Sequence, residues 1–189
     1  MTAVSELHRG VLVKNAQTEI LKGTGYALRA ARPYDVAVIL DLREKNAQWL
    51  QGIGSDQWAQ PVTPRKVSKF ESDIKNGNTW IAVDGNEPIA SISLSSSGDG
   101  RLWTPAELEE PALYASSLLV VPEHKGNQIG AKLLDWAQEK AHAEGKKWVR
   151  LDCWTTNSKL HEYYTEQGFS HVRTILDRKS GALFQRSTA

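Results

Sequence analysis

The chain has 189 residues, of which 40% are hydrophobic and 24% charged, as expected for a globular protein with a sizeable core. Lys and Arg number 23 against 22 Asp and Glu, so a net charge of +1 argues against a dedicated nucleic-acid binder. No apolar run approaches the roughly 18 residues that span a bilayer, and residues 1–10 lack the apolar middle of a secretory signal. The lone Cys153 cannot form an internal disulfide, so we expect a cytoplasmic protein without membrane partners.

The first half of the chain predicts an arm followed by a strand, two helices and a hairpin. Apolar spacing is weak over residues 1–23, which read as the arm, and residues 24–189 read as one domain. Thr63 fits a helix cap, and Pro64 fits the first helical position after it. The predicted elements are a strand over 26–31, helices over 33–52 and 64–74, and strands over 79–83 and 88–94.

The second half begins with a polar, acidic connection over 95–111 and then alternates strands with helices. The predicted elements are a strand over 113–121, a helix over 127–144, a strand over 148–153, a helix over 158–167, and strands over 169–176 and 182–186. Gly145 is the expected stop of the longer helix. This order predicts a mixed sheet with helices on its faces, in the α/β (α+β) class.

The most informative segment runs from Leu118 through a short polar loop to Leu134. A strand that leads through such a loop into a helix leaves the first helical N–H groups free to bind a phosphate or pyrophosphate. Gly126 and Gly130 lack a Cβ and let a ligand approach the backbone, and Lys125 can add positive charge. A plain strand-to-helix turn, in which the glycines only relieve steric strain, explains the same pattern.

This segment resembles the acyl-CoA-binding segment of the GNAT superfamily, the Gcn5-related N-acetyltransferases. The family pattern is a strand ending in Val-x-Pro, followed by Gln or Arg, two residues, Gly, one residue, and Gly or Ala. Four residues fit it: Val120, Pro122, Ile129 and Gly130. Lys125 stands where the family has Gln or Arg. Gln128 replaces the middle glycine, and its side chain would crowd the pyrophosphate or lie along it.

A second stretch strengthens the resemblance. The family's strand, asparagine, tyrosine and Gly-Phe ending are matched by Arg150-Leu-Asp-Cys-Trp154, Asn157, Leu160, Tyr163, Tyr164, Gly168 and Phe169. The resemblance covers the chain from about Ala27 to the C-terminus. It implies a GNAT-like fold, in which a mixed, mostly antiparallel sheet flanked by helices is splayed between two parallel strands.

The resemblance also implies a cofactor and a mechanism. Acetyl-CoA is the expected acyl donor, and an amine attacks its thioester directly, while Tyr164 protonates the leaving thiolate. The alternative for Tyr164 is a packed aromatic side chain. The implied cofactor-binding residues are Leu118, Leu119 and Val120 for the pantetheine arm, Lys125, Gly126, Asn127, Gln128, Ile129 and Gly130 for the pyrophosphate, and Asn157 for the arm.

The general base and the acceptor site are less well defined by the sequence. Candidate proton acceptors or relays are Glu107, Glu109, Glu110, Ser116, Ser117 and Asp152. Cys153 could carry an acyl group, although a lone cysteine on a buried strand is more often inert. An acceptor site between the first two helices would include Asp56, Trp58 and Trp103, because aromatic rings with one carboxylate suit a cationic amine. No metal site is expected.

Three functions fit these observations. The first is an N-acetyltransferase for a primary amine of a small molecule, and the second acts on a protein or aminoacyl-tRNA amine. The third is a degenerate acyl-CoA-binding sensor without catalysis. Gln128 favours the sensor, whereas Tyr164 and Asn157 favour an enzyme. A homodimer is a further expectation, because dimers are common in families that this chain resembles.

Overall fold

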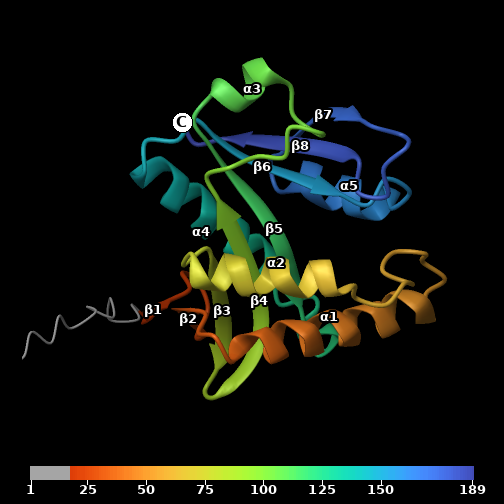
Figure 1. The fold of residues 1–189 in the computed structure, drawn as a ribbon. Helices are drawn as coiled ribbons and strands as arrows, with labels where there is room; N and C mark the ends of the chain where they lie inside the picture. The colour runs from red at the N-terminus through yellow and green to blue at the C-terminus, as the bar shows by residue number, and fades with distance from the viewer. Residues whose placement is uncertain (1–17) are drawn as a thin grey trace, which may run out of the picture.

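The computed structural model describes residues 18–189, so the first 17 residues of the predicted arm lie outside the described part. One eight-stranded sheet runs through it, in the order β1-β2-β3-β4-β5-β6-β8-β7, with helices packed on its faces (Figure 1). The elements are β1 (Thr18–Ile20), β2 (Ala27–Ala30), α1 (Asp35–Gly52), α2 (Pro64–Lys75), β3 (Thr79–Asp84), β4 (Glu87–Ser95), α3 (Pro105–Glu109), β5 (Ala112–Val120), the 3-10 helix η1 (Pro122–His124), α4 (Ile129–Ala143), β6 (Trp148–Cys153), α5 (Ser158–Glu166), β7 (Ser170–Thr174) and β8 (Ala182–Ser187).

The sheet confirms the predicted class. All neighbouring strands pair antiparallel except β5 and β6, which run parallel. A parallel pair requires a crossover, and α4 supplies it between these two strands. The central strand β4 is buried at every position from Ile89 to Leu94, because helices cover both of its faces.

The helices show the capping residues and the spacing of buried residues that the sequence predicted. Thr63 caps α2 by accepting a hydrogen bond from the Lys66 backbone, and Pro64 occupies the first turn. The buried residues of α1 recur every three or four positions, so that helix lays one apolar stripe on the sheet. In Figure 1, α1 and α2 lie on one face of the sheet and α4 on the other. No helix in residues 18–189 is long and apolar enough to cross a membrane.

Three short elements differ from the prediction. Strand β1 lies inside the predicted arm and pairs with β2, while α3 and η1 lie in segments that the sequence left irregular. Helix α3 does carry a local signal, because Thr104 and Glu107 form a reciprocal capping box around Pro105. Apolar periodicity cannot reveal elements of three to five residues, since they span little more than one turn or one pleat.

The sheet splays between β5 and β6. Their parallel pairing runs from Ala112 opposite Trp148 to Ala115 opposite Leu151, whereas β5 continues to Val120. A bulge at Ser117, which has a φ of 52°, bends β5 where the pairing with β4 changes register. The splay leaves backbone groups on the diverging part of β5 without a partner from β6.

Candidate active site

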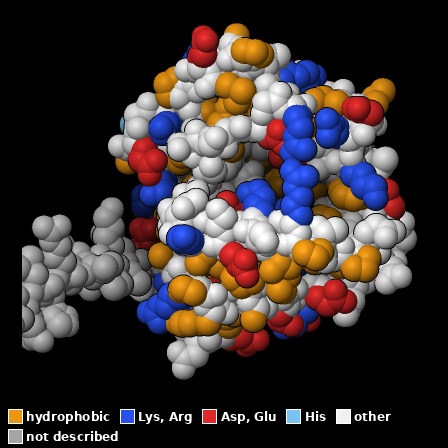
Figure 2. Space-filling model, in the orientation of Figure 1, with side chains coloured by type: hydrophobic (Ala, Val, Ile, Leu, Met, Phe, Trp, Pro, Cys, Tyr) orange, Lys and Arg blue, Asp and Glu red, His pale blue; other side chains and the backbone are white. Residues whose placement is uncertain are grey.

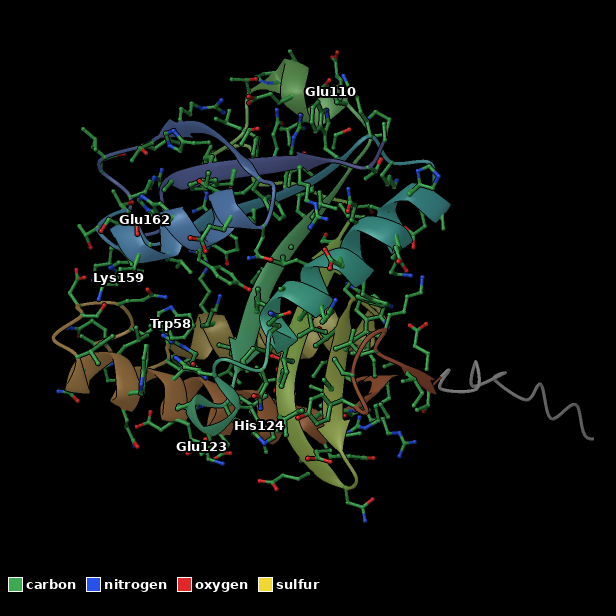
Figure 3. All side chains as sticks on the ribbon, turned by 180° about the vertical axis from the view of Figure 1, so that it is seen from behind. Trp58, Glu110, Glu123, His124, Lys159 and Glu162 are labelled. Atoms are coloured by element: carbon green, nitrogen blue, oxygen red, sulfur yellow. The ribbon has the colours of Figure 1, made fainter. Side chains whose placement is uncertain are left out.

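A cavity of about 700 Å³ opens where β5 and β6 diverge. This volume is typical of a small-molecule or cofactor site. Its walls come from α1, the loop after α1, β5, the loop before α4, β6 and α5. In Figure 3, Trp58 from the loop after α1 and Lys159 from α5 lie near each other, and both line this cavity.

The loop between β5 and α4 has the backbone shape that the sequence suggested. Gly126 has a φ of 90°, and Gln128, the N-cap of α4, has a φ of 56° in the left-handed region. Glycine adopts that conformation freely, whereas for a residue with a Cβ it costs about 1 kcal/mol or more of conformational free energy. The Gln128 side chain makes no capping hydrogen bond. The first N–H groups of α4 therefore lie open beside the cavity.

Gly130 makes room for a tyrosine of the opposite wall. A Cβ at this position would lie 2.7 Å from the Tyr163 hydroxyl, which is closer than real Cβ contacts allow. Burial is the main reason that the pKa of Tyr163 is raised to about 12. The absence of a side chain at 130 thus lets α4 and α5 approach each other at the edge of the splay.

Lys125 points into the mouth of the cavity. Its ammonium lies 3.1 Å from the centre of the Trp49 ring, a cation–π contact with a side chain that is 39% exposed. Burial lowers the pKa of Lys125 to about 8. No carboxylate of the described residues pairs with this ammonium, which leaves it available to an anionic ligand.

Hydrogen bonds tie the loop after α1 to the start of α5. Asn157 caps α5 by accepting from the Leu160 backbone at 3.1 Å, and its amide donates to Gln57 at 2.7 Å. Asp56 accepts from Trp154 at 2.9 Å and from Thr156 at 3.0 Å. These bonds lower the pKa of Asp56 and fix one wall of the cavity.

Tyr164 lies at the bottom of the splay. Its ring packs against Tyr163, Phe169 and Phe184 with centroid distances of 5.4 to 5.9 Å, and the residue is 8% exposed. The residue lines the cavity, and its hydroxyl makes no hydrogen bond within residues 18–189. Burial raises the pKa of Tyr164 well above its usual range, so the hydroxyl stays protonated.

Asp152 and Cys153 end β6 on the other side of the splay. Ser180, in the connection between β7 and β8, donates to the Asp152 carboxylate at 2.6 Å. Burial raises the pKa of Asp152, which makes its carboxylate a stronger base than an exposed one. Burial also raises the pKa of Cys153 to about 12, so its thiol is not ionised near neutral pH.

Two of the three candidate glutamates before β5, Glu107 and Glu110, have structural roles. Glu107 pairs with Arg173 at 2.6 Å, and Glu110 pairs with Lys147 and with the fully buried Arg150. Hydrogen bonds from these partners lower the pKa of both glutamates to about 2. Neither lines the cavity, and Figure 3 shows Glu110 at the end of the molecule away from Trp58 and His124. They are therefore poor candidates for a general base.

Most of the residues predicted for the site surround this one cavity. Those that line it are Leu118, Val120, Lys125, Gly126, Gln128, Ile129, Gly130, Asn157, Tyr164 and Trp58. The Leu119 side chain is buried in the core instead, since side chains alternate along β5, and Asn127 points to solvent. Asp56 does not line the cavity, and its carboxylate accepts hydrogen bonds from Trp154 and Thr156 instead.

Trp103 lies away from the cavity. Its ring packs against Tyr114 at 5.8 Å and under the guanidinium of Arg150 at 4.9 Å, and the residue is 3% exposed. The sequence could not show this, because the partners of Trp103 come from two separate strands. Ser180 was missed for a similar reason: 28 positions separate it from Asp152, and no local pattern marks it.

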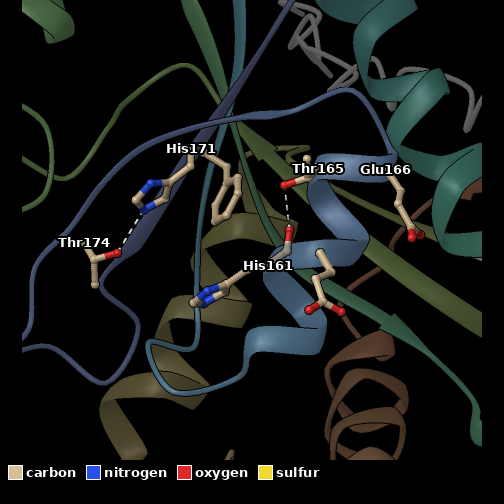
Figure 4. Close-up of a pocket in the computed structure, with 7 residues that line it drawn as sticks. His161, Thr165, Glu166, His171 and Thr174 are labelled. Atoms are coloured by element: carbon tan, nitrogen blue, oxygen red, sulfur yellow. Dashed lines mark hydrogen bonds between the residues drawn. The ribbon is translucent and has the colours of Figure 1, made fainter.

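A second cavity of about 430 Å³ lies between α5 and β7 (Figure 4). His171 bonds to the Thr174 hydroxyl at 2.9 Å, and His161 bonds to the Trp154 carbonyl at 2.9 Å. The Thr165 hydroxyl donates to the His161 carbonyl. Because both imidazoles have partners within the protein, the larger cavity at the splay is the better candidate for chemistry.

The splayed sheet, the open start of α4 and the buried tyrosine together define an acyltransferase of the GNAT type. Residues 29–169 match the family model described as the acetyltransferase (GNAT) family. The match covers well over half of the chain, so the protein belongs to this family and is an acyltransferase.

Known relatives agree with this assignment. The chain is 29% identical over 141 residues to an uncharacterized N-acetyltransferase, YesJ, of Bacillus subtilis, covering 73% of this chain and 78% of that one. It is 34% identical over 58 residues to the aminoalkylphosphonate N-acetyltransferase of Salmonella typhimurium, covering 30% and 38%. The PaiA N-acetyltransferase of Thermoplasma acidophilum in complex with coenzyme A is similar in fold, with a TM-score of 0.66, 19% identity and coverage of 87% and 99%.

Proposed function

We propose that this protein transfers the acetyl group of acetyl-CoA to a primary amine of a small molecule. The observation that carries the proposal is the cavity at the splay, which has a buried tyrosine and a partly buried aspartate among its lining residues. The fold-related PaiA protein was solved with coenzyme A, which supports a CoA thioester as the donor. Acetyl is the simplest acyl group consistent with the family name.

The donor would lie along the diverging end of β5. Unpaired backbone groups of Leu118 to Val120 would bond to the pantetheine arm, while the N–H groups at the start of α4 would bind the pyrophosphate. Lys125 would leave Trp49 and approach the phosphates. The Asn157 amide has one N–H beyond the one it donates to Gln57, and this second N–H would reach the arm.

Direct attack fits the groups around the thioester. The ammonium of the acceptor loses a proton to Asp152, the amine nitrogen bonds to the carbonyl carbon, and the carbon–sulfur bond breaks. The Tyr164 hydroxyl donates its proton to the thiolate, giving free CoA. The second proton of the nitrogen, which leaves as the amide forms, passes to the tyrosinate and restores Tyr164. A covalent relay through Cys153 is disfavoured because its thiol stays protonated.

A small acceptor fits better than a protein or a tRNA. The cavity has the volume of a small-molecule site, and the partly buried carboxylate of Asp152 lines it and accepts a hydrogen bond from Ser180. The relative from Salmonella typhimurium is named for a small amine, which supports the same class of acceptor.

Release of free thiol from acetyl-CoA, followed with a thiol reagent across a panel of primary amines, tests this function. We expect turnover with at least one small amine and only slow hydrolysis without one. Turnover on peptides or charged tRNA alone would replace the small acceptor with the alternative substrates. Tight acetyl-CoA binding with no turnover on any amine would identify an acyl-CoA sensor.

A further inference from the structure

Two cationic side chains, those of Arg43 and Lys66, lie on α1 and α2, next to the residues that line the cavity but not among them. Arg43 on α1 lies one turn before Asn46, which lines the cavity, and positions three apart share a helix face. Lys66 lies in the first turn of α2, one turn before the buried Phe70. Lys and Arg side chains gather around a hollow on the face of the molecule shown in Figure 2.

Neither cation has an anionic partner among the residues that the structure describes. Nε and Nη1 of Arg43 are buried and make no hydrogen bond, and its guanidinium lies 4.6 Å from the centre of the Trp58 ring. The Lys66 ammonium lies 5.3 Å from the centre of the Phe70 ring and forms no ion pair. Nearby Lys69 is different, because Asp73 neutralises it at 2.6 Å.

The pKa values of Arg43 and Lys66 are shifted by burial and by charged neighbours. Burial is the main cause of the lowered pKa of both Arg43 and Lys66. The pKa of Lys66 is lowered further by Lys69 and Arg43, and it is raised in part by Asp152 and Asp73. The charges of both Arg43 and the Asp152 carboxylate, which lines the cavity, therefore act on Lys66.

Leaving two partly buried cations without an ion-pair partner costs stability. Such an arrangement persists in enzymes when the partner arrives with the substrate. We propose that the acceptor carries an acidic group, a carboxylate or a phosphonate, which binds between Arg43 and Lys66 while its amine binds at Asp152. The inference rests on the proposed function and narrows the acceptor to short amino acids and amino phosphonates.

The phosphates of the donor are a poorer explanation for this cluster. They belong at the start of α4, near Lys125, whose ammonium lies over Trp49 near the other end of α1. Arg43 precedes Trp49 by six residues, which is about 9 Å along a helix. Substitution of the cluster should therefore leave the KM for acetyl-CoA unchanged.

The test compares three amines of similar size with the full-length enzyme: 3-aminopropanoate, 2-aminoethylphosphonate and propylamine. We expect at least one acidic amine to be acetylated about tenfold or more faster than propylamine, judged by kcat/KM. Lys66→Gln and Arg43→Gln should each lower kcat/KM for that amine by about 10- to 100-fold, the usual effect of losing a hydrogen bond to a charged group. Propylamine turnover should change little.

Lys45→Gln is the matched control, because Lys45 lies on α1 and pairs with Asp41 at 2.9 Å on the exposed side. A second readout is independent of catalysis: methylphosphonate or acetate should raise the melting temperature of the wild type but not of Lys66→Gln. A phosphonate acceptor predicts stabilisation of the protein by methylphosphonate and a preference for 2-aminoethylphosphonate. A carboxylate acceptor predicts stabilisation by acetate and a preference for 3-aminopropanoate.

Equal use of propylamine and the acidic amines by the wild type would overturn the inference while leaving the proposed function intact. An unchanged preference for the acidic amine in both Lys66→Gln and Arg43→Gln would also overturn the inference. If no amine releases thiol, the proposed function fails, and the melting experiment alone decides whether the cluster binds an anion.

Discussion

At the residue scale, the chemistry of Tyr164 follows from its burial among aromatic rings. This burial raises its pKa and keeps its hydroxyl protonated, yet the residue lines the cavity. A proton donor of this kind acts only as charge develops on the leaving sulfur. Its packing and its proposed catalytic role can therefore be separated by removing one oxygen atom.

We expect Tyr164→Phe to lower kcat by about 10²- to 10⁴-fold, the range for losing a general acid. The ring remains, so the melting temperature and the KM for acetyl-CoA should change little. Tyr163→Phe is the comparison, because Tyr163 lines the same cavity on the same helix. Wild-type turnover in Tyr164→Phe would show that another group or water protonates the thiolate, and early unfolding would show a structural role.

Lys125 gives a prediction about pH. Its ammonium has a pKa of about 8 in the free protein, where burial disfavours the charged form. Anionic phosphates bind the charged form more tightly, so the affinity for acetyl-CoA should fall as the pH rises through 8. Calorimetric titrations at pH 7 and pH 9 measure this change, and Lys125→Gln should remove most of it. An equally steep pH dependence in the variant would assign it to another group.

At the scale of elements, the start of α4 combines an open anion site with local strain. Gln128 holds a left-handed conformation that costs about 1 kcal/mol for a residue with a Cβ, and its side chain makes no capping bond in return. This conformation explains why a glycine is typical at the corresponding position of the family pattern.

Gln128→Gly should therefore raise the free energy of unfolding by up to about 1 kcal/mol and keep or improve acetyl-CoA affinity. Urea denaturation and calorimetric titration measure the two effects. Asn127→Gly is the matched control, because Asn127 is the neighbouring loop residue and does not have a positive φ. A clear loss of affinity in Gln128→Gly alone would mean that the glutamine side chain contacts the cofactor.

At the scale of the whole molecule, ligand binding should bridge the two parts of the splayed sheet. Acetyl-CoA at a hundredfold excess over its Kd should stabilise the fold by about 3 kcal/mol. Scanning calorimetry with and without the ligand measures this. Gly130→Ala should reduce the gain because its Cβ would meet Tyr163, whereas Gly100→Ala is a control with only ordinary contacts. No shift with either CoA or acetyl-CoA would contradict the proposed cofactor.

The sequence by itself determined the order of the longer elements, the mixed sheet and the strand–loop–helix at residues 118–134. Each of these follows from local signals: the spacing of apolar residues, the Thr63 cap, and turns rich in glycine. The same signals placed Tyr164 and Asn157 on or next to a short helix, and the family resemblance supplied their expected roles.

Only the tertiary structure decided which polar groups share the cavity and which hold the fold together. It removed Trp103 and two of the glutamates before β5 from the site, because their partners on β5, β6 and β7 are distant in sequence. It also brought Ser180 to Asp152, and Arg43 to Trp58. The physical reason is that burial and pairing set the charge and pKa of these groups, and both depend on contacts between distant segments, which a local pattern does not encode.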